Sequence, residues 1–189
     1  MKALCFSALL LFCSAAAAEA PPLAAYISDG DLFRVSLPAA WNRNEAITAR
    51  RQLLQYGVDA MGPGSAQNGY PRISVMYYSK GHKQFRTMEK YVAANSRPAG
   101  FSPLKGEKFS PVSSARAAGR PAKLLEAVRV EYLPPHSARP LKISFYQRQL
   151  VFPGKTGGFF VLEYYAPLDA AKEFLPVFEA VAASLKINI

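Results

Sequence analysis

Histidine and cysteine, which supply most metal ligands and many catalytic nucleophiles, are scarce in this chain. His82 lies between lysines and His136 follows two prolines, so both are expected to be exposed in loops. The two cysteines, Cys5 and Cys13, lie near the N-terminus. A structural zinc site needs four such ligands, held together in space. The sequence therefore predicts no metal site, no disulfide scaffold and no cofactor.

A catalytic triad is the next arrangement that could do chemistry. Ser114, His136 and Glu163 supply the three residue types, but the chain has no GxSxG elbow and no spacing that selects these three residues. The carboxylates are few and scattered. We expect no catalytic residue and no enzymatic activity.

Two aspartates flank a glycine in the segment Ser28-Asp29-Gly30-Asp31, which superficially resembles the start of a calcium loop. An EF-type loop needs further oxygen ligands and a distal bidentate glutamate. The following Leu32-Phe33-Arg34 supplies none of these. We interpret the segment as a tight turn that enters the first strand.

Other acidic residues lie inside expected strands. Glu126, Glu131 and Glu163 could form a polar cluster with Arg129 or Arg148 if they share a face of the sheet. Such a cluster is typical of ordinary cross-strand pairing.

The excess of basic residues is the most informative feature of the composition. The 189 residues include 23 lysines and arginines against 13 aspartates and glutamates, a formal net charge of +10. Such a charge steers anionic partners toward a protein. The chain has no nucleic-acid recognition motif, so we expect an acidic protein or an anionic envelope component, such as lipid head groups or polysaccharide. The alternative is a basic, well-solvated surface without a partner.

Six residues are candidates for a binding surface because they occupy polar or solvent-facing positions near a central strand and its loop. They are Arg72, Tyr78, Lys80, Lys83, Arg86 and Arg148. Exposed aromatic residues beside cations make good interface anchors. The alternative for the tyrosines is packing between the sheet and the helices.

Residues 1–18, MKALCFSALLLFCSAAAA, have the pattern of a signal peptide. Lys2 supplies the positive start, and the apolar run 3–12 is far shorter than the roughly 20 residues of a membrane-spanning helix. Ala16 and Ala18 suit signal peptidase. Cleavage after Ala18 removes Lys2 and leaves a cysteine-free mature chain with a net charge of +9 and no transmembrane segment. We expect this mature chain to be periplasmic or secreted.

Lipidation of Cys13 is the alternative, although the bulky Phe12 stands where a lipoprotein signal needs a small residue. After the signal peptide, residues 19–25 are expected to be a short unpacked leader. Residues 26–189 then form a single domain.

Five runs have the composition and alternation of strands, and they span residues 32–37, 72–79, 120–133, 141–152 and 158–166. The last three are joined by short proline- and glycine-rich turns, which predicts an antiparallel meander. In the first run, Phe33, Val35 and Leu37 share one face.

Two segments have helical spacing, residues 85–95 and residues 170–185, the second with Asp169 as N-cap. Pro176 predicts a kink, or a second helix that starts near it. Residues 47–61 fit either a short helix or a strand pair, and the loops are 61–71 and 98–116. These elements predict an α+β fold, an antiparallel sheet with helices packed on its faces.

Three segments carry a family resemblance. Residues 33–41 read FRVSLPAAW, residues 72–78 precede a helix, and residues 159–167 read FFVLEYYAP before the closing helix. In this order they resemble the fold of the PsbP subunit of photosystem II and the Mog Ran-binding protein, with their bacterial DcrB-like relatives. The resemblance implies a non-enzymatic module that docks on, or stabilises, a larger assembly, and it transfers no functional residue.

We therefore expect an exported binding or accessory module that docks on an anionic partner through a basic, aromatic-bearing surface. The alternative is a small-molecule or lipid carrier that uses a cleft between the sheet and the helices.

Overall fold

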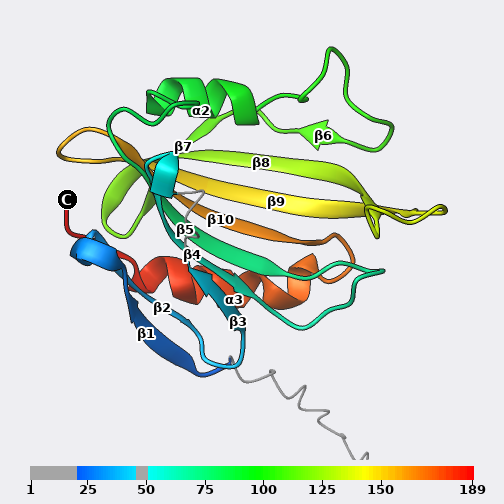
Figure 1. Cartoon of the computed structure of the whole chain (residues 1–189), viewed down its shortest axis with the longest axis horizontal. Helices are drawn as coiled ribbons and strands as arrows, with labels where there is room; N and C mark the ends of the chain where they lie inside the picture. The colour runs from blue at the N-terminus through cyan, green and yellow to red at the C-terminus, as the bar shows by residue number, and fades with distance from the viewer. Residues whose placement is uncertain (1–20, 46–50) are drawn as a thin grey trace, which may run out of the picture.

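The computed structural model describes residues 21–45 and 51–189 and has an α+β fold (Figure 1). Its strands are β1 (Leu23–Ile27), β2 (Phe33–Pro38), β3 (Asn42–Glu45), β4 (Gln55–Met61), β5 (Arg72–Tyr78), β6 (Lys108–Phe109), β7 (Ser113–Ala117), β8 (Arg120–Leu133), β9 (Leu141–Pro153), β10 (Phe159–Pro167) and β11 (Lys186–Ile187). The helices are α2 (Met88–Asn95) and α3 (Ala171–Ser184), and a 3-10 turn, η1, spans Asp29–Asp31. The predicted signal peptide and Cys13 lie outside the described residues.

The described strands form two antiparallel sheets. The larger sheet has eight strands in the order β3-β4-β5-β10-β9-β8-β6, with β7 also paired to β8. The smaller sheet has the order β1-β2-β11. The predicted meander is confirmed as β8-β9-β10, which lies in the middle of the larger sheet.

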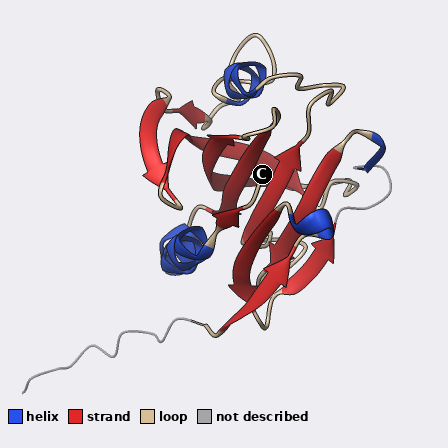
Figure 2. Ribbon diagram, turned by 90° about the vertical axis from the view of Figure 1, so that its left-hand side faces the viewer, coloured by secondary structure: helices blue, strands red, loops and turns tan. Residues whose placement is uncertain are grey.

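Both faces of the larger sheet are covered, because adjacent residues of a strand point to opposite faces. Tyr77 and Phe160 belong to the main core, which α3 and the smaller sheet close. Tyr78 and Phe159 belong to a second cluster, which α2 closes. Figures 1 and 2 show the two helices on different sides of the strands. The predicted α+β architecture, with helices on the sheet faces, is confirmed.

Helix α3 is a single helix with Pro176 inside it, so the expected second helix that starts near Pro176 is wrong. An interior proline costs ~3 kcal/mol because it removes a backbone donor. Val177, Phe178 and Val181 are buried on the same helix, and each contributes roughly 1.5–3 kcal/mol. Packing against the sheet therefore outweighs the local defect.

The helix starts differ from the expected ones by a few residues. Helix α2 begins at Met88 because Thr87 is its N-cap, and the Thr87 hydroxyl accepts a hydrogen bond from the Lys90 N–H at 3.3 Å. Helix α3 has Ala170 rather than Asp169 at its N-cap. The Asp169 carboxylate accepts a hydrogen bond from the Ala170 N–H at 2.9 Å, one position too early to act as a cap.

Some segments expected to be irregular are strands. The expected leader, residues 19–25, includes the start of β1, which pairs along its whole length with β2. The expected loop 98–116 contains β6 and most of β7, both of which pair with β8. Pairing partners distant in sequence stabilise these short strands, and their own composition does not reveal them. The end of the ambiguous segment 47–61 is the strand β4, and residues 46–50 lie outside the described residues.

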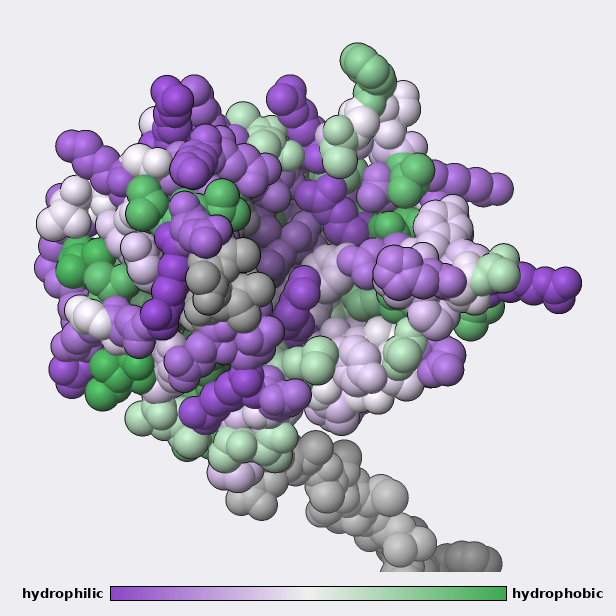
Figure 3. Space-filling model, viewed as in Figure 1, coloured by the Kyte–Doolittle hydropathy of each residue, from purple (hydrophilic) through white to green (hydrophobic). Residues whose placement is uncertain are grey.

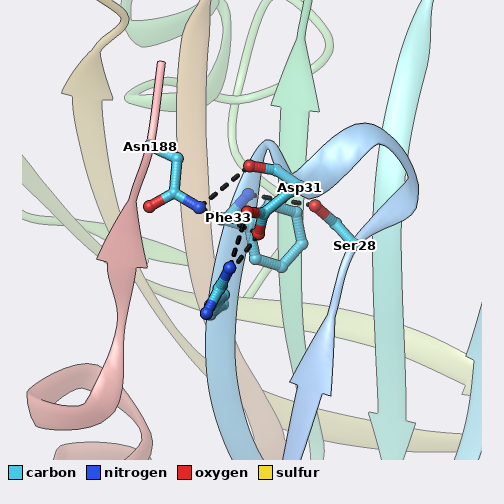
Figure 4. Close-up of polar contacts among 5 residues, drawn as sticks. Ser28, Asp31, Phe33 and Asn188 are labelled. Atoms are coloured by element: carbon cyan, nitrogen blue, oxygen red, sulfur yellow. Dashed lines mark hydrogen bonds and ion pairs between the residues drawn. The ribbon is translucent and has the colours of Figure 1, made fainter.

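The turn before β2 is fastened to the C-terminus (Figure 4). Ser28 Oγ accepts a hydrogen bond from the Phe33 N–H at 3.0 Å, and Asn188 Nδ2 donates to both the carbonyl and the carboxylate of Asp31 at 2.9 Å. Arg34 donates to the same carboxylate at 2.9 and 2.7 Å, and this hydrogen bonding lowers the pKa of Asp31. The interpretation of this segment as a turn that enters the first strand is confirmed.

Candidate binding surface on the helix α2 side of the sheet

The six candidate surface residues lie in separate places. Lys80, Lys83 and Arg86 are exposed together in the loop between β5 and α2. Arg72 starts β5, and Tyr78 ends it. A seven-residue strand spans about 20 Å, so Arg72 is distant from the three loop cations.

Arg72 lines a pocket of about 270 Å³ at the end of the sheet where β5 begins and β8 ends. Its guanidinium lies 5.2 Å from the centroid of the Tyr165 ring, which stacks on Phe145. The Tyr165 hydroxyl donates to Glu131 at 2.5 Å. Burial and this hydrogen bond raise the pKa of Tyr165. The pocket is therefore amphipathic and combines both charge signs, which does not favour a simple anion.

Tyr78 does not face solvent, which corrects its assignment to the surface. The side chain is buried and its ring stacks on Phe159 at 4.7 Å. The run from Val75 to Tyr78 carries large apolar residues at every position, and such a pattern indicates a strand that is covered on both faces. That signal was present in the sequence. The alternative for the tyrosines, core packing, is confirmed for the buried Tyr77, Tyr78, Tyr164 and Tyr165.

Arg148 lies on the opposite face of the sheet, with α3, and is already paired. Its guanidinium lies 2.8 Å from Glu179 and 3.9 Å from Glu126, its cross-strand neighbour. It also lies over the Phe178 ring at 5.9 Å. The expected cross-strand pairing of Glu126 with Arg148 is confirmed, whereas Arg129 bonds Gln147 instead of a glutamate.

His82 is buried, which corrects the expectation of an exposed loop histidine. The residue is 1% exposed and lies between the rings of Tyr78 and Phe85, with centroids at 5.0 and 6.0 Å. His82 Nδ1 accepts a hydrogen bond from the Phe85 N–H at 3.0 Å. Burial lowers the pKa of His82. Tyr78 and Phe85 enclose His82 only once the loop has folded, so the sequence does not reveal this burial.

Residues 79–110, which we call the α2 layer, concentrate the basic charge. The layer contains seven cationic side chains against two carboxylates, Glu89 and Glu107. All seven cations are exposed, and none forms an ion pair with another described residue: Lys80, Lys83, Arg86, Lys90, Arg97, Lys105 and Lys108. Figure 3 shows hydrophilic side chains gathered along the top of the molecule, where Figure 1 draws α2.

The α2 layer is held on the sheet by both apolar and polar contacts. Tyr91 is buried beside Tyr78, with ring centroids 5.2 Å apart. The Tyr91 hydroxyl accepts a hydrogen bond from Gln149 Nε2 at 3.1 Å, and burial raises the pKa of Tyr91 well above 10. At the other end of α2, Arg129 donates to the carbonyl of Asn95 at 3.0 Å. These contacts fix the position of the exposed cations.

An open depression of about 480 Å³ lies at the start of α2. Lys80 and Arg86 line it, together with Thr156 and Gly157 of the β9–β10 turn. Gly157 and Gly158 adopt positive φ angles of 88° and 79°, and a Cβ on Gly158 would lie 2.4 Å from the Tyr78 carbonyl oxygen. Glycine therefore permits this turn to pack close beside the cationic loop.

The residues of the catalytic triad considered in the sequence analysis lie far apart, and no metal-ligand group forms among the described residues. Ser114 lies opposite Lys123 at one end of β8, and His136 is exposed beyond the other end, about 30 Å along the strand. Glu163 accepts hydrogen bonds from Gln147 and Gln149. Among residues 21–45 and 51–189, no three histidine, cysteine or acidic side chains are grouped as metal ligands.

A mainly apolar cleft of about 730 Å³ lies between α3 and the turns that follow β2 and β4. Trp41 and Phe174 form part of its lining, with ring centroids 5.8 Å apart, and Pro176 and Val177 extend it. This position matches the sheet–helix cleft expected for a carrier. In the part of the chain that the structure describes, no helix is long and apolar enough to cross a membrane.

Comparison with solved structures places this architecture among known folds. The solution structure of the cyanobacterial PsbP protein (CyanoP) of Synechocystis aligns with a TM-score of 0.50 and 13% identity, covering 93% of this chain and 98% of that one. The fold is PsbP-like. This alignment confirms the fold that the sequence resemblance implied.

Two further structures align over most of their length. Mog1p, a Ran-binding protein of Saccharomyces cerevisiae, has a TM-score of 0.48 and 8% identity, covering 88% of this chain and 96% of that one. LpqN, involved in cell envelope biogenesis of Mycobacterium tuberculosis, has a TM-score of 0.46 and 17% identity, covering 83% of each chain. No protein-family model and no curated protein matches this chain.

Proposed function

We propose that the chain is an exported, non-enzymatic accessory module that docks on an anionic partner through the α2 layer. Export rests on the signal-peptide pattern of residues 1–18. The PsbP-like fold supports an accessory function by analogy, because the PsbP subunit of photosystem II belongs to a larger assembly.

The observation that carries the proposal is the unpaired charge of the α2 layer. Seven exposed cations face solvent against two carboxylates on this one layer. Unpaired cations on one face raise the local concentration of an anionic partner and its association rate. On the α3 side, by contrast, Arg148 is neutralised by Glu126 and Glu179.

Charge reversal of the loop cations tests the proposal. We expect Lys80→Glu, Lys83→Glu and Arg86→Glu together to weaken partner capture at least tenfold, because each reversal replaces an attraction with a repulsion. Crosslinking of the tagged protein in its native host, at low and high salt, followed by mass spectrometry, measures capture. The melting temperature should not fall, because the three side chains are exposed.

The matched control reverses three exposed cations elsewhere, Arg116, Lys172 and Lys186, and so changes the net charge by the same amount. We expect it to retain capture. Capture that survives reversal of the loop cations, or that both triple variants lose equally, contradicts docking through the α2 layer.

A second candidate function, a carrier of an apolar small molecule or lipid, is favoured by the cleft beside α3. Its lining of Trp41, Phe174, Pro176 and Val177 suits an apolar ligand. Native mass spectrometry of the freshly purified protein measures whether a ligand is retained. A bound ligand that Phe174→Asp abolishes supports the carrier function, and a ligand-free protein with salt-sensitive capture supports the docking module.

A further inference from the structure

The loop after α2 carries its apolar side chains outward. Phe101 is fully exposed, with a relative accessibility of 110%, and Leu104 is 50% exposed. Single exposed apolar residues are common on proteins, but here two lie three positions apart in one projecting loop. We call residues 97–108 the tip loop. Figure 3 shows a hydrophobic group projecting at the top of the molecule, where Figure 1 draws this loop.

Hydrogen bonds within the tip loop, and one from strand β9, hold its backbone. The Leu104 N–H donates to the Glu107 carboxylate at 2.9 Å, and the Glu107 N–H donates to the Leu104 carbonyl at 2.9 Å. Lys142 Nζ, from the β8–β9 hairpin, donates to the Lys105 carbonyl. These contacts hold the backbone of the segment that carries Leu104, whose side chain is half exposed.

Cations surround these apolar side chains. Arg97, Lys105 and Lys108 are exposed within the tip loop, and Lys142 reaches it from the neighbouring hairpin. The carboxylate of Glu107 accepts a hydrogen bond from the loop backbone and forms no ion pair with another described residue. Leu141, which precedes Lys142, is 54% exposed and adds apolar surface at this end of the molecule.

We propose that the tip loop docks on the surface of an anionic phospholipid bilayer, with Phe101 and Leu104 inserted among the lipids and the surrounding cations at the phosphate level. This inference rests on the proposed function, because it names the chemistry of the anionic partner. Apolar side chains at the acyl boundary with lysines and arginines at the head groups are the usual arrangement of interfacial protein segments.

A membrane accounts for this geometry better than an acidic protein does. Protein interfaces bury their aromatic anchors in a pocket at the centre of a flat, closely packed patch. Phe101 instead stands at the tip of a projecting loop, with cations on both sides in the sequence. A deformable bilayer accepts such a projection without a complementary pocket, and the cations add attraction that salt screens.

Vesicle binding tests the proposal directly. We expect the purified protein to co-sediment with vesicles of phosphatidylglycerol and phosphatidylcholine at low salt, and at least tenfold less with pure phosphatidylcholine or at high salt. In Phe101→Trp the fluorescence emission should shift to the blue on addition of the anionic vesicles, and lipids brominated on the acyl chain should quench it. Trp41 is buried, so it gives a constant background.

Two double variants test the apolar and the cationic side chains of the tip loop independently. We expect Phe101→Ser with Leu104→Ser, and independently Lys105→Glu with Lys108→Glu, each to reduce binding to anionic vesicles about tenfold or more. The control Leu23→Ser with Ile27→Ser removes two exposed apolar side chains from β1, and it should bind as the unmodified protein does.

Absence of binding to anionic vesicles overturns the proposal. Binding that leaves the fluorescence of Phe101→Trp unshifted overturns it too, and so does binding that neither tip-loop variant reduces. If vesicle binding is absent while charge reversal at Lys80, Lys83 and Arg86 still abolishes salt-sensitive capture of an acidic protein, the docking function stands and the lipid partner is wrong. If charge reversal also leaves capture unchanged, both proposals fail.

Discussion

At the scale of single residues, His82 links the packing of the α2 layer to pH. Its ring is enclosed by Tyr78 and Phe85, and its Nδ1 accepts a backbone hydrogen bond that a second ring proton would remove. Burial lowers the pKa of His82 in the folded protein, whereas the unfolded chain retains the ordinary value of about 6.5. The unfolded state therefore binds a proton first as the pH falls.

This difference in pKa predicts acid destabilisation. Because the unfolded state binds more protons below pH 6.5, the free energy of unfolding should decrease as the pH falls from 7.5 to 5.5. His82→Gln should reduce that decrease, and His136→Gln, at an exposed position, should not. Urea denaturation at several pH values measures the slopes. Equal slopes for all three proteins would show that His82 does not titrate differently on folding.

At the scale of elements, α3 combines a weak local sequence with strong tertiary packing. Pro176 is exposed inside the helix and cannot donate a backbone hydrogen bond, whereas Val177, Phe178 and Val181 are buried against the sheet. The helix therefore persists because of its buried face. Helix α2 is also held by its buried face, because its residue Tyr91 packs in the second cluster.

Pro176→Ala should stabilise the protein by about 2 kcal/mol. Restoring the missing donor gains ~3 kcal/mol, and the greater freedom of the unfolded chain offsets roughly 0.4–1 kcal/mol of that gain. Guanidinium denaturation, with the m-value unchanged, measures the effect. A loss of stability would mean that packing of the proline ring in the apolar cleft matters more than the backbone donor.

At the scale of the whole molecule, the first two described strands and the last one form the smaller sheet together. Strand β11 pairs with β2, Ile187 is buried, and Asn188 bonds the turn at Asp31. Arg120 of the larger sheet donates to the Ile187 carbonyl at 3.2 Å. The last residues therefore join the smaller sheet to both the N-terminal turn and the larger sheet.

Removal of residues 186–189 should lower the free energy of unfolding by about 4–6 kcal/mol. Burial of Ile187 contributes roughly 1.5–3 kcal/mol, and each hydrogen bond lost adds about 1 kcal/mol. Hydrogen exchange in β2 should accelerate, because its edge becomes open on that side. Deletion of Ile189 alone keeps β11 and is the control. An unchanged stability for the longer deletion would show that the smaller sheet closes without its third strand.

The regular strands and the overall fold were predictable because their signals are local. Phe33, Val35 and Leu37 alternate along β2, and the proline and glycine turns separate β8, β9 and β10. The fold class follows from the order of such elements. The short strands β1, β6 and β7 were missed because their stability comes from pairing with partners distant in sequence.

The candidate site was only partly predictable, for a related reason. The amount of basic charge and its density around Lys80, Lys83 and Arg86 are properties of the sequence alone. Which cations remain unpaired is a tertiary property: Arg148 meets Glu126 across strands and Glu179 from α3, which brings residues far apart in the chain within ion-pair distance. The burial of a side chain is also a tertiary property. His82 and Tyr78 become enclosed only when the α2 layer packs on the sheet.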